Sequence, residues 1–432
     1  MVLRKASDSL KGDVMKMQHS DMKKRRGERQ ALCIASVASN LDNFNRNNVE
    51  ILLSQGYEVT LAANFHTEED TNSQEKIDSF AREMREKGVH IVQIDFSRKI
   101  GSAARQLRSV GQVRKLLKRQ FCLIHCHAPI CAAIVRWEAR KYRRRRGTKV
   151  LYTAHGFHFF TGAPALNWAL YYPVEKWMSR YTDVLLTVNR EDYTRAKERF
   201  HASRTVCLPG VGVDAEKFFR RLEDRAERRR ALGLADTDRM LLSVGELNEN
   251  KNQELGILAL ARAVAGGSRG TENMHYFICG QGRLRTRLEA LAEEKGLKDK
   301  VHFLGYRSDI EHILACADIF LSLSKREGLP VSLMEAMCSG LPGIVTRVRG
   351  NTDLIRDGME GRVVGYGVGE LAHVLEWAAV NEKRLGQMGE NARKRIKRFD
   401  KKIVDEMMWK VYAGFEMSEE SVLSPKTGAE NG

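Results

Sequence analysis

The chain alternates between short apolar runs and longer segments in which apolar residues recur every three or four positions. The runs predict buried strands, and the periodic segments predict helices between them. The runs lie at 30–37, 56–63, 90–94, 123–126, 149–153 and 183–188, and then at 239–244, 275–279, 301–304, 319–322 and 343–346. Such alternation is typical of parallel sheets that are covered by helices on both faces.

The length of the chain favours two domains, because 432 residues are many for a single hydrophobic core. A turn-rich stretch at 208–214 predicts the linker between them. We therefore expect an α/β protein with two doubly wound, Rossmann-like parallel sheets, in domains at 29–213 and 214–400. A basic extension at 1–28 precedes them, and a polar tail at 417–432 is expected to be disordered.

Residues 36–48, rich in Ser, Asn and Asp, predict a polar loop between the first strand and a helix at 49–55. Ser39 and Asn40 lie in this loop. Amide side chains both donate and accept hydrogen bonds, which suits the hydroxyls of a carbohydrate. Asx turns and a helix cap would explain the same residues, and both interpretations stay open.

The composition is that of a globular protein, with 43% apolar and 29% charged residues. No stretch approaches the ~20 apolar residues that a membrane-spanning helix needs, and the first thirty residues lack the apolar core of a secretory signal. Eight scattered cysteines fit reduced thiols in a cytoplasm. Cys122, Cys126 and Cys131 surround His125, but this segment reads as a buried strand, so we expect no metal site.

The net charge of +17 is concentrated in one block: residues 98–149 contain sixteen basic residues and one acid, Glu138. Nucleic acid and anionic lipid both attract such a block, while solvated helix faces are the simpler explanation. Only Trp137 and Tyr142 are aromatic among the densest charges, so base stacking has little support. We therefore expect an anionic membrane surface as a partner and no nucleic acid.

Two acids eight residues apart, Glu327 and Glu335, carry the most information about chemistry. Glu327 follows a predicted strand, at the edge where open α/β sheets bind ligands, and Glu335 lies in the first turns of the next helix. The N–H groups at the start of that helix favour an anion such as a diphosphate. Carboxylates beside an anion need hydroxyl donors, and a nucleotide-sugar offers phosphates and hydroxyls together. Two solvated surface acids are the alternative.

Further residues follow predicted strands of the C-terminal half. Gly245 allows a ligand to approach the backbone, and Lys251 can reach a diphosphate as a point charge. Gly280 and Arg283 belong to a partial dinucleotide fingerprint, which is a weak signal. Lys251 and Arg283 could also be ordinary surface residues.

The segment 324–340, together with Tyr-Thr-Ala-His-Gly-Phe-His at 152–158 and Tyr-Tyr-Pro-Val-Glu-Lys-Trp at 171–177, resembles the retaining glycosyltransferases of family four. The resemblance covers residues from about 30 to 415. It implies the GT-B fold, in which two doubly wound domains face a cleft and a final helix, here 401–416, returns to the first domain. It is most similar to the exopolysaccharide and capsule type of bacteria.

The resemblance implies roles for individual residues. Glu327 would contact hydroxyls of the donor sugar, Glu335 would contact the ribose, and His155 would approach the transferred sugar. The implied donor site contains Gly245, Lys251, Gly280, Arg283, Tyr306, Gly328, Leu329, Pro330, Val331 and Glu335, and the implied acceptor site contains Ser39, Asn40, His127 and His158. Glu246 stands where the family usually has a phosphate-binding arginine.

We thus expect a metal-independent glycosyltransferase of hexosyl type without a cofactor. Its donor would be a nucleotide-sugar, UDP-linked by expectation, and its acceptor a saccharide on a polyprenyl diphosphate. Such an enzyme would be cytoplasmic and peripherally bound to the inner face of the membrane. A nucleotide-sugar 2-epimerase and a nucleic-acid-binding protein are the alternatives. A nicotinamide oxidoreductase would require a more complete glycine fingerprint.

Overall fold

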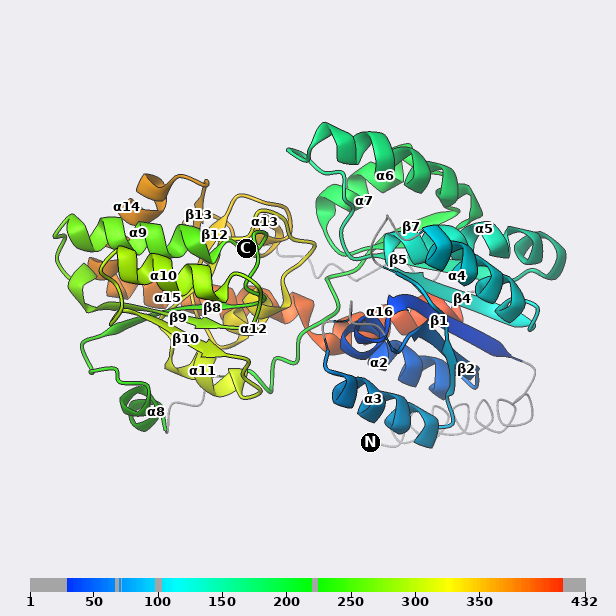
Figure 1. Cartoon of the computed structure of the whole chain (residues 1–432), viewed down its shortest axis with the longest axis horizontal. Helices are drawn as coiled ribbons and strands as arrows, with labels where there is room; N and C mark the ends of the chain where they lie inside the picture. Colours follow the sequence, from blue (N-terminus) through cyan, green and yellow to red (C-terminus); the bar gives the residue numbers. More distant parts are fainter. Residues whose placement is uncertain (1–28, 67–69, 71, 98–102, 220–223, 415–432) are drawn as a thin grey trace, which may run out of the picture. The chain divides into compact units, whose positions relative to one another are not determined.

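The computed structural model of the chain describes residues 29–66, 70, 72–97, 103–219 and 224–414. They divide into two compact units, each with one parallel sheet (Figure 1). The described residues of the first unit fall within 29–187, 192–208 and 405–414, and those of the second within 188–191 and 209–404. The predicted extension at 1–28 and tail at 417–432 lie outside the described residues.

The first unit contains a seven-stranded sheet in the order β3-β2-β1-β4-β5-β6-β7. Its strands are β1 (Gln30–Val37), β2 (Glu58–Asn64), β3 (His90–Gln93), β4 (Phe121–His127), β5 (Lys149–Ala154), β6 (Val184–Thr187) and β7 (Arg204–Cys207). The helices between them are α2 (Ala38–Ser54), α3 (Gln74–Glu86), α4 (Ala103–Leu116), α5 (Pro129–Arg146), α6 (Ala165–Met178) and α7 (Arg190–Arg199). The strand order reverses between β1 and β4, which makes their carboxyl ends the expected ligand position of this sheet.

The second unit contains a six-stranded sheet in the order β10-β9-β8-β11-β12-β13. Its strands are β8 (Arg239–Val244), β9 (Met274–Cys279), β10 (Val301–Gly305), β11 (Ile319–Ser322), β12 (Gly343–Thr346) and β13 (Gly361–Val364). Its helices are α8 (Arg225–Ala231), α9 (Gln253–Ala265), α10 (Arg285–Glu294), α11 (Ile310–Cys316), α12 (Val331–Cys338), α13 (Asn351–Leu354), α14 (Val368–Val380) and α15 (Glu382–Ile396). Here the order reverses between β8 and β11.

The core of the second unit shows why its strands are apolar almost without interruption. Side chains alternate between the two faces of a strand, so a sheet that is covered on both faces needs apolar residues at every position. Leu241 of β8 belongs to one buried cluster, while its neighbours Met240 and Leu242 belong to another. The predicted class, α/β with two doubly wound parallel sheets, is confirmed.

The last helix, α16 (Lys401–Ala413), is anchored in the first unit through its second half. The carboxylate of Asp405 accepts a hydrogen bond from Asn47, and the carbonyl of Trp409 accepts one from Gln55, both on or just after α2. The hydroxyl of Tyr412 contacts His125 in β4. None of the helices in the described parts of the chain is long and apolar enough to cross a membrane.

The predicted polar loop at 36–48 is wrong, because β1 leads directly into α2 at Ala38. The polar residues form local contacts that a helix allows: Asp42 pairs with Arg46 at 2.7 Å, one turn away, and Asn45 donates to the carbonyl of Asn40. Leu41, Asn45, Val49 and Leu52 form the buried face. The strands β7 and β13, which have four residues each and lie at sheet edges, were not predicted either.

Candidate active site

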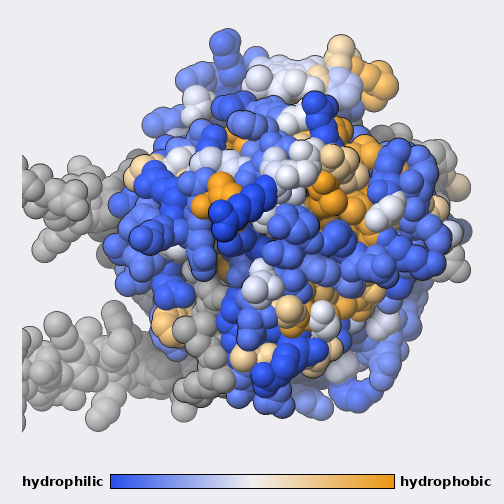
Figure 2. Space-filling model, turned by 90° about the vertical axis from the view of Figure 1, so that its left-hand side faces the viewer, coloured by the Kyte–Doolittle hydropathy of each residue, from blue (hydrophilic) through white to orange (hydrophobic). Residues whose placement is uncertain are grey.

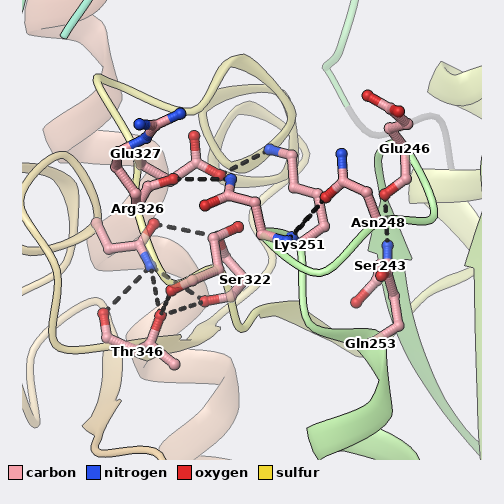
Figure 3. A network of polar contacts seen from close by, with 12 residues as sticks. Ser243, Glu246, Asn248, Lys251, Gln253, Ser322, Arg326, Glu327 and Thr346 are labelled. Atoms are coloured by element: carbon pink, nitrogen blue, oxygen red, sulfur yellow. Dashed lines mark hydrogen bonds and ion pairs between the residues drawn. The ribbon is translucent and has the colours of Figure 1, made fainter. Parts of the chain in front are cut away.

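Lys251 and Glu327 meet at the point of the second sheet where the strand order reverses. Lys251 lies in the segment between β8 and α9, Glu327 lies between β11 and α12, and β8 and β11 are paired neighbours. The Lys251 ammonium and the Glu327 carboxylate are 2.6 Å apart (Figure 3). Both side chains are half-buried or more deeply buried. The pair therefore lies where open α/β sheets bind their ligands.

The two segments that carry this pair are held together by hydrogen bonds in the described structure. The amide N–H of Lys325 donates to the carbonyl of Asn250 at 2.8 Å, and the Asn250 side chain donates to the carbonyl of Arg326 at 3.0 Å. The Asn252 side chain donates to the carbonyl of Leu323 at 3.2 Å. Asn252 has φ of 57°, a left-handed conformation that asparagine tolerates better than most residues. These asparagines were not predicted, although Asn before a helix and after a strand is a recognisable turn signal.

A third segment supports Glu327 from its other side. The guanidinium of Arg349 donates to the backbone carbonyl of Glu327 at 3.2 Å. A Cβ on Gly350 would lie 2.5 Å from the carbonyl oxygen of Gly328, so the approach of these two segments requires glycine at 350. Arg349 and Gly350 also went unpredicted, because their role depends on which strands are neighbours.

Glu335 lies on α12, which begins at Val331 after Pro330 in an extended conformation. Burial raises the pKa of Glu335 to about 7, with the charge of Lys217 acting in the opposite direction and that of Glu311 adding to the rise. The carboxyl group therefore changes its charge near neutral pH. Gly328 and Leu329 are half-buried in the segment before the helix, and Pro330 is buried.

The remaining predicted donor residues also follow strands of this sheet. A Cβ on Gly280 would lie 1.9 Å from the carbonyl oxygen of Gly245, so the turns after β8 and β9 touch backbone to backbone. Tyr306, directly after β10, is 67% exposed and available to a ligand.

Two charged residues of this sheet edge are less well placed for a phosphate. Arg283 forms an ion pair with Glu249, and both side chains are exposed. The carboxylate of Glu246 points away from Lys251 and Glu327 (Figure 3), which removes one repulsion toward an anion there.

The first unit has a cluster of imidazoles at the carboxyl ends of β4 and β5. His127 Nδ1 lies 3.3 Å from His155 Nε2, and the two rings stack. Burial lowers the pKa of His155 to about 4. Burial, together with the neighbouring His155, lowers the pKa of His125 to about 3. The pKa of His127 is lowered well below its usual value, first by burial and then by His125 and His155. All three rings are therefore neutral at pH 7, and they can offer hydrogen bonds but no fixed charge.

Within this cluster, both ring nitrogens of His125 have a hydroxyl partner. Its Nδ1 lies 2.7 Å from the hydroxyl of Tyr412 and its Nε2 lies 2.7 Å from that of Thr153. By contrast, His127 Nε2 is buried and has no hydrogen-bond partner among the described residues. A polar atom in that state is suited to receive a ligand group.

The other predicted acceptor residues of this unit are placed less favourably. Ser39 is only 2% exposed, and its amide donates to the carboxylate of Asp70 at 3.0 Å. Asn40 lies beside it in the first turn of α2 and is half-buried. His158 stacks on Tyr171 of α6, with ring centres 4.5 Å apart. Ser39 thus has little surface to offer a substrate, whereas Asn40 keeps some.

Two parallel Rossmann-like sheets, with Lys251 and Glu327 at the strand-order reversal of one and His127 beside that of the other, fit the class of transferases with the GT-B fold. Comparison with known proteins agrees with this class. Residues 224–395 match the family model "Glycosyl transferases group 1", and residues 44–217 match "Glycosyltransferase Family 4". The chain belongs to the family-four type of glycosyltransferases with the GT-B fold.

Two relatives and two solved structures illustrate the similarity. EpsD of Bacillus subtilis (strain 168), classed as a glycosyltransferase, is 37% identical over 72% of this chain and 82% of its own length. An Escherichia coli UDP-Gal:α-D-GlcNAc-diphosphoundecaprenol α-1,3-galactosyltransferase is 27% identical over 68% of this chain and 76% of its own.

The solved structures share the fold at lower identity. Anabaena HepE, in a crystal structure with UDP and glucose, has a TM-score of 0.69 and 17% identity over 89% of this chain and 99% of its own. WaaG, a glycosyltransferase of lipopolysaccharide biosynthesis, has a TM-score of 0.67 and 20% identity, over 89% of this chain and 100% of its own.

Proposed function

We propose that this glycosyltransferase transfers a hexosyl-type unit from a UDP-linked sugar to a lipid-linked saccharide, with retention of the anomeric configuration, in the synthesis of an exopolysaccharide or capsule. The observation that carries the proposal is the contact between Lys251 and Glu327 at the strand-order reversal of the second sheet. It combines a cation for a diphosphate with a carboxylate for sugar hydroxyls.

The proposed chemistry rests on charge that develops on the leaving diphosphate. Lys251 and the N–H groups at the start of α12 would stabilise this charge, which is commonly a large share of catalysis. Because a lysine and a helix start supply the positive charge, we also propose that transfer needs no bound metal ion. The acceptor hydroxyl would attack on the face that the diphosphate leaves and give up its proton to the departing phosphate.

The carboxylates and the histidine would position the reactants. Glu327 would accept hydrogen bonds from hydroxyls of the donor sugar, and Glu335 from those of the ribose. Neutral His155 would offer a hydrogen bond to the transferred sugar, with His127 fixing its ring.

A screen of nucleotide-sugars with the purified protein tests the proposal. We expect slow hydrolysis of one UDP-sugar without acceptor, and much slower hydrolysis by the variant Glu327→Gln. Glu294→Gln, on an exposed residue of the same unit, is the matched control. Conversion of the nucleotide-sugar into its 2-epimer, with no sugar released or transferred, would show an epimerase instead.

The lipid-linked acceptor would bring the protein to the cytoplasmic face of a membrane. The relative from Escherichia coli is named for an acceptor on diphosphoundecaprenol. In the first unit, the C-terminal end of α5 exposes Lys141, Arg144, Arg145 and Arg146, which suit an anionic surface. Arg143 belongs to the structure instead, because its guanidinium forms two hydrogen bonds to Asp183, at 2.8 and 2.9 Å.

A further inference from the structure

Helix α6 presents an apolar face to solvent. Leu166, Leu170, Val174 and Trp177 are 67%, 51%, 46% and 45% exposed. Their spacing of four, four and three residues places them on one side of the helix. The other exposed residues of α6 are Ala165, Ala169 and Pro173, so no polar residue interrupts this face.

The structure fixes this orientation from the inner side of the helix. The carboxylate of Glu175 is buried, where it accepts hydrogen bonds from Arg136 at 2.7 Å and from the hydroxyl of Tyr152 at 2.9 Å. Trp168 and Tyr172 pack around Phe159 of the core. Rotation of the helix to hide the apolar face would bring Glu175 out of its ion pair and these aromatic rings into water.

Scattered exposed apolar residues are ordinary, and they need no special explanation. The face of the molecule in Figure 2 is mostly hydrophilic, with hydrophobic residues in separate areas. In α6, by contrast, the exposed apolar residues are continuous over nearly four turns. A continuous face of this kind marks an interaction surface.

The chemistry beside this face selects its partner. At the C-terminal end of α6, the ring of Trp177 packs on that of Trp137 in α5, with centres 5.0 Å apart. The guanidinium of Arg140 lies 3.5 Å from the centre of the Trp137 ring. Lys176 directly precedes Trp177 in the sequence, and Arg180 follows three residues later. The exposed cations of α5, Lys141, Arg144, Arg145 and Arg146, lie at the C-terminal end of that helix. The single acid of α5 near them, Glu138, is paired with Arg114 at 2.9 Å.

We propose that the exposed face of α6 enters the boundary between headgroups and acyl chains of an anionic bilayer. Tryptophan prefers this boundary, Leu and Val prefer the layer just beneath it, and Lys and Arg bind the anionic headgroups. The inference rests on the proposed lipid-linked acceptor and deepens it. The cations of α5 provide the long-range electrostatic attraction to the bilayer. The apolar face of α6 provides the part of the binding free energy that salt does not screen, and it determines which part of the first unit touches the lipid.

Vesicle sedimentation separates the two components. Vesicles of phosphatidylethanolamine and phosphatidylglycerol are mixed with the whole protein at low and at high salt. Leu166→Ser/Leu170→Ser is expected to weaken binding about tenfold at both salt concentrations, since two leucines lose part of their transfer free energy. Lys141→Ser/Arg144→Ser/Arg145→Ser should weaken binding at low salt only, because salt already screens these charges at high concentration.

The matched control is Met359→Ser/Val380→Ser, which removes two exposed apolar residues from the second unit and should bind like the unchanged protein. A second measurement places the helix in the bilayer. With the exposed Cys122 changed to Ser, a fluorophore on Leu170→Cys should be quenched by lipids that carry bromine on their acyl chains. The same fluorophore on Met359→Cys should not be quenched.

Three outcomes would overturn the inference, and a fourth would contradict the proposed function alone. Unchanged binding of the double leucine variant, or equal quenching at positions 170 and 359, would mean that α6 stays outside the bilayer. Concentration-dependent self-association that the leucine variant abolishes, without any vesicle binding, would assign the face to a second copy of the chain. Vesicle binding by α6 without hydrolysis of any nucleotide-sugar would contradict the proposed function and leave the inference standing.

Discussion

At the scale of single residues, the contact between Lys251 and Glu327 makes a specific prediction about phosphate. Removing the ammonium in Lys251→Ala should weaken binding of a nucleoside diphosphate about 10- to 100-fold, because hydrogen bonds to charged groups contribute roughly 1.5–3 kcal/mol. Binding of the nucleoside alone should change little. Calorimetric titration with both ligands measures this, with Lys325→Ala, an exposed lysine of the same sheet edge, as control. Equal losses for the two ligands would assign Lys251 to structure.

Glu335 predicts a pH dependence. Its pKa is raised from 4.5 to about 7, so the folded protein holds a proton there that the unfolded chain has lost. The free energy of unfolding therefore falls as pH rises from about 4.5 to about 7. Glu335→Gln should remove this contribution to the pH dependence of the free energy of unfolding.

The same titration should affect nucleotide binding, because only the ionised carboxylate accepts hydrogen bonds from both ribose hydroxyls. We expect affinity to rise with pH through about 7 in the unchanged protein, more steeply than in Glu335→Gln. The diphosphate titrates equally in both cases, so the difference between the two curves belongs to Glu335. Parallel curves would contradict the ribose contact.

At the scale of elements, the turns after β8 and β9 depend on a close approach of backbones. In Gly280→Ala, the new Cβ would lie 1.9 Å from the carbonyl oxygen of Gly245, at a φ of +145° that other residues rarely adopt. We expect a loss of about 1–3 kcal/mol in the free energy of unfolding, as for other overpacked sites, and weaker binding of nucleoside diphosphate. Gly386→Ala, where nothing lies within 4 Å and the backbone is helical, is the control and should leave stability unchanged or slightly raised.

Helix α16 makes a second prediction at this scale. Tyr412→Phe would leave His125 Nδ1 buried without its partner, which should cost about 1–3 kcal/mol and loosen the helix from β4. Hydrogen exchange of residues 401–413 should accelerate in this variant and remain unchanged in Trp409→Phe, whose side chain is exposed. Unchanged exchange in Tyr412→Phe would show that the apolar contacts of α16 suffice.

The elements also show what the sequence could predict. Mostly apolar runs such as β8 and β11 were located within a residue or two, because a strand buried on both faces has few polar positions. The start of α2 was missed, because side chains of Asn and Asp that favour turns found partners within the helix. Glu327 and Lys251 were predicted from their positions after strands. Arg349 and Asn250 were not, because only the order of strands in the second sheet brings them beside the segment of Glu327. The contact of Tyr412 with His125 was not predicted either, because it depends on how α16 packs on the first unit.

At the scale of the whole molecule, the source of positive charge for the leaving diphosphate determines the response to metal ions. If Lys251 and the start of α12 supply it, chelation of divalent cations with EDTA should leave the rate of transfer within about twofold, because no part of the transition-state stabilisation would come from a metal. Magnetic resonance of the product should show the anomeric configuration of the donor. In Lys251→Ala, by contrast, added Mg²⁺ should restore part of the activity, since a cation on the diphosphate can replace the missing ammonium. A rate that falls with EDTA in the unchanged protein, or a product of inverted configuration, would contradict the proposed mechanism.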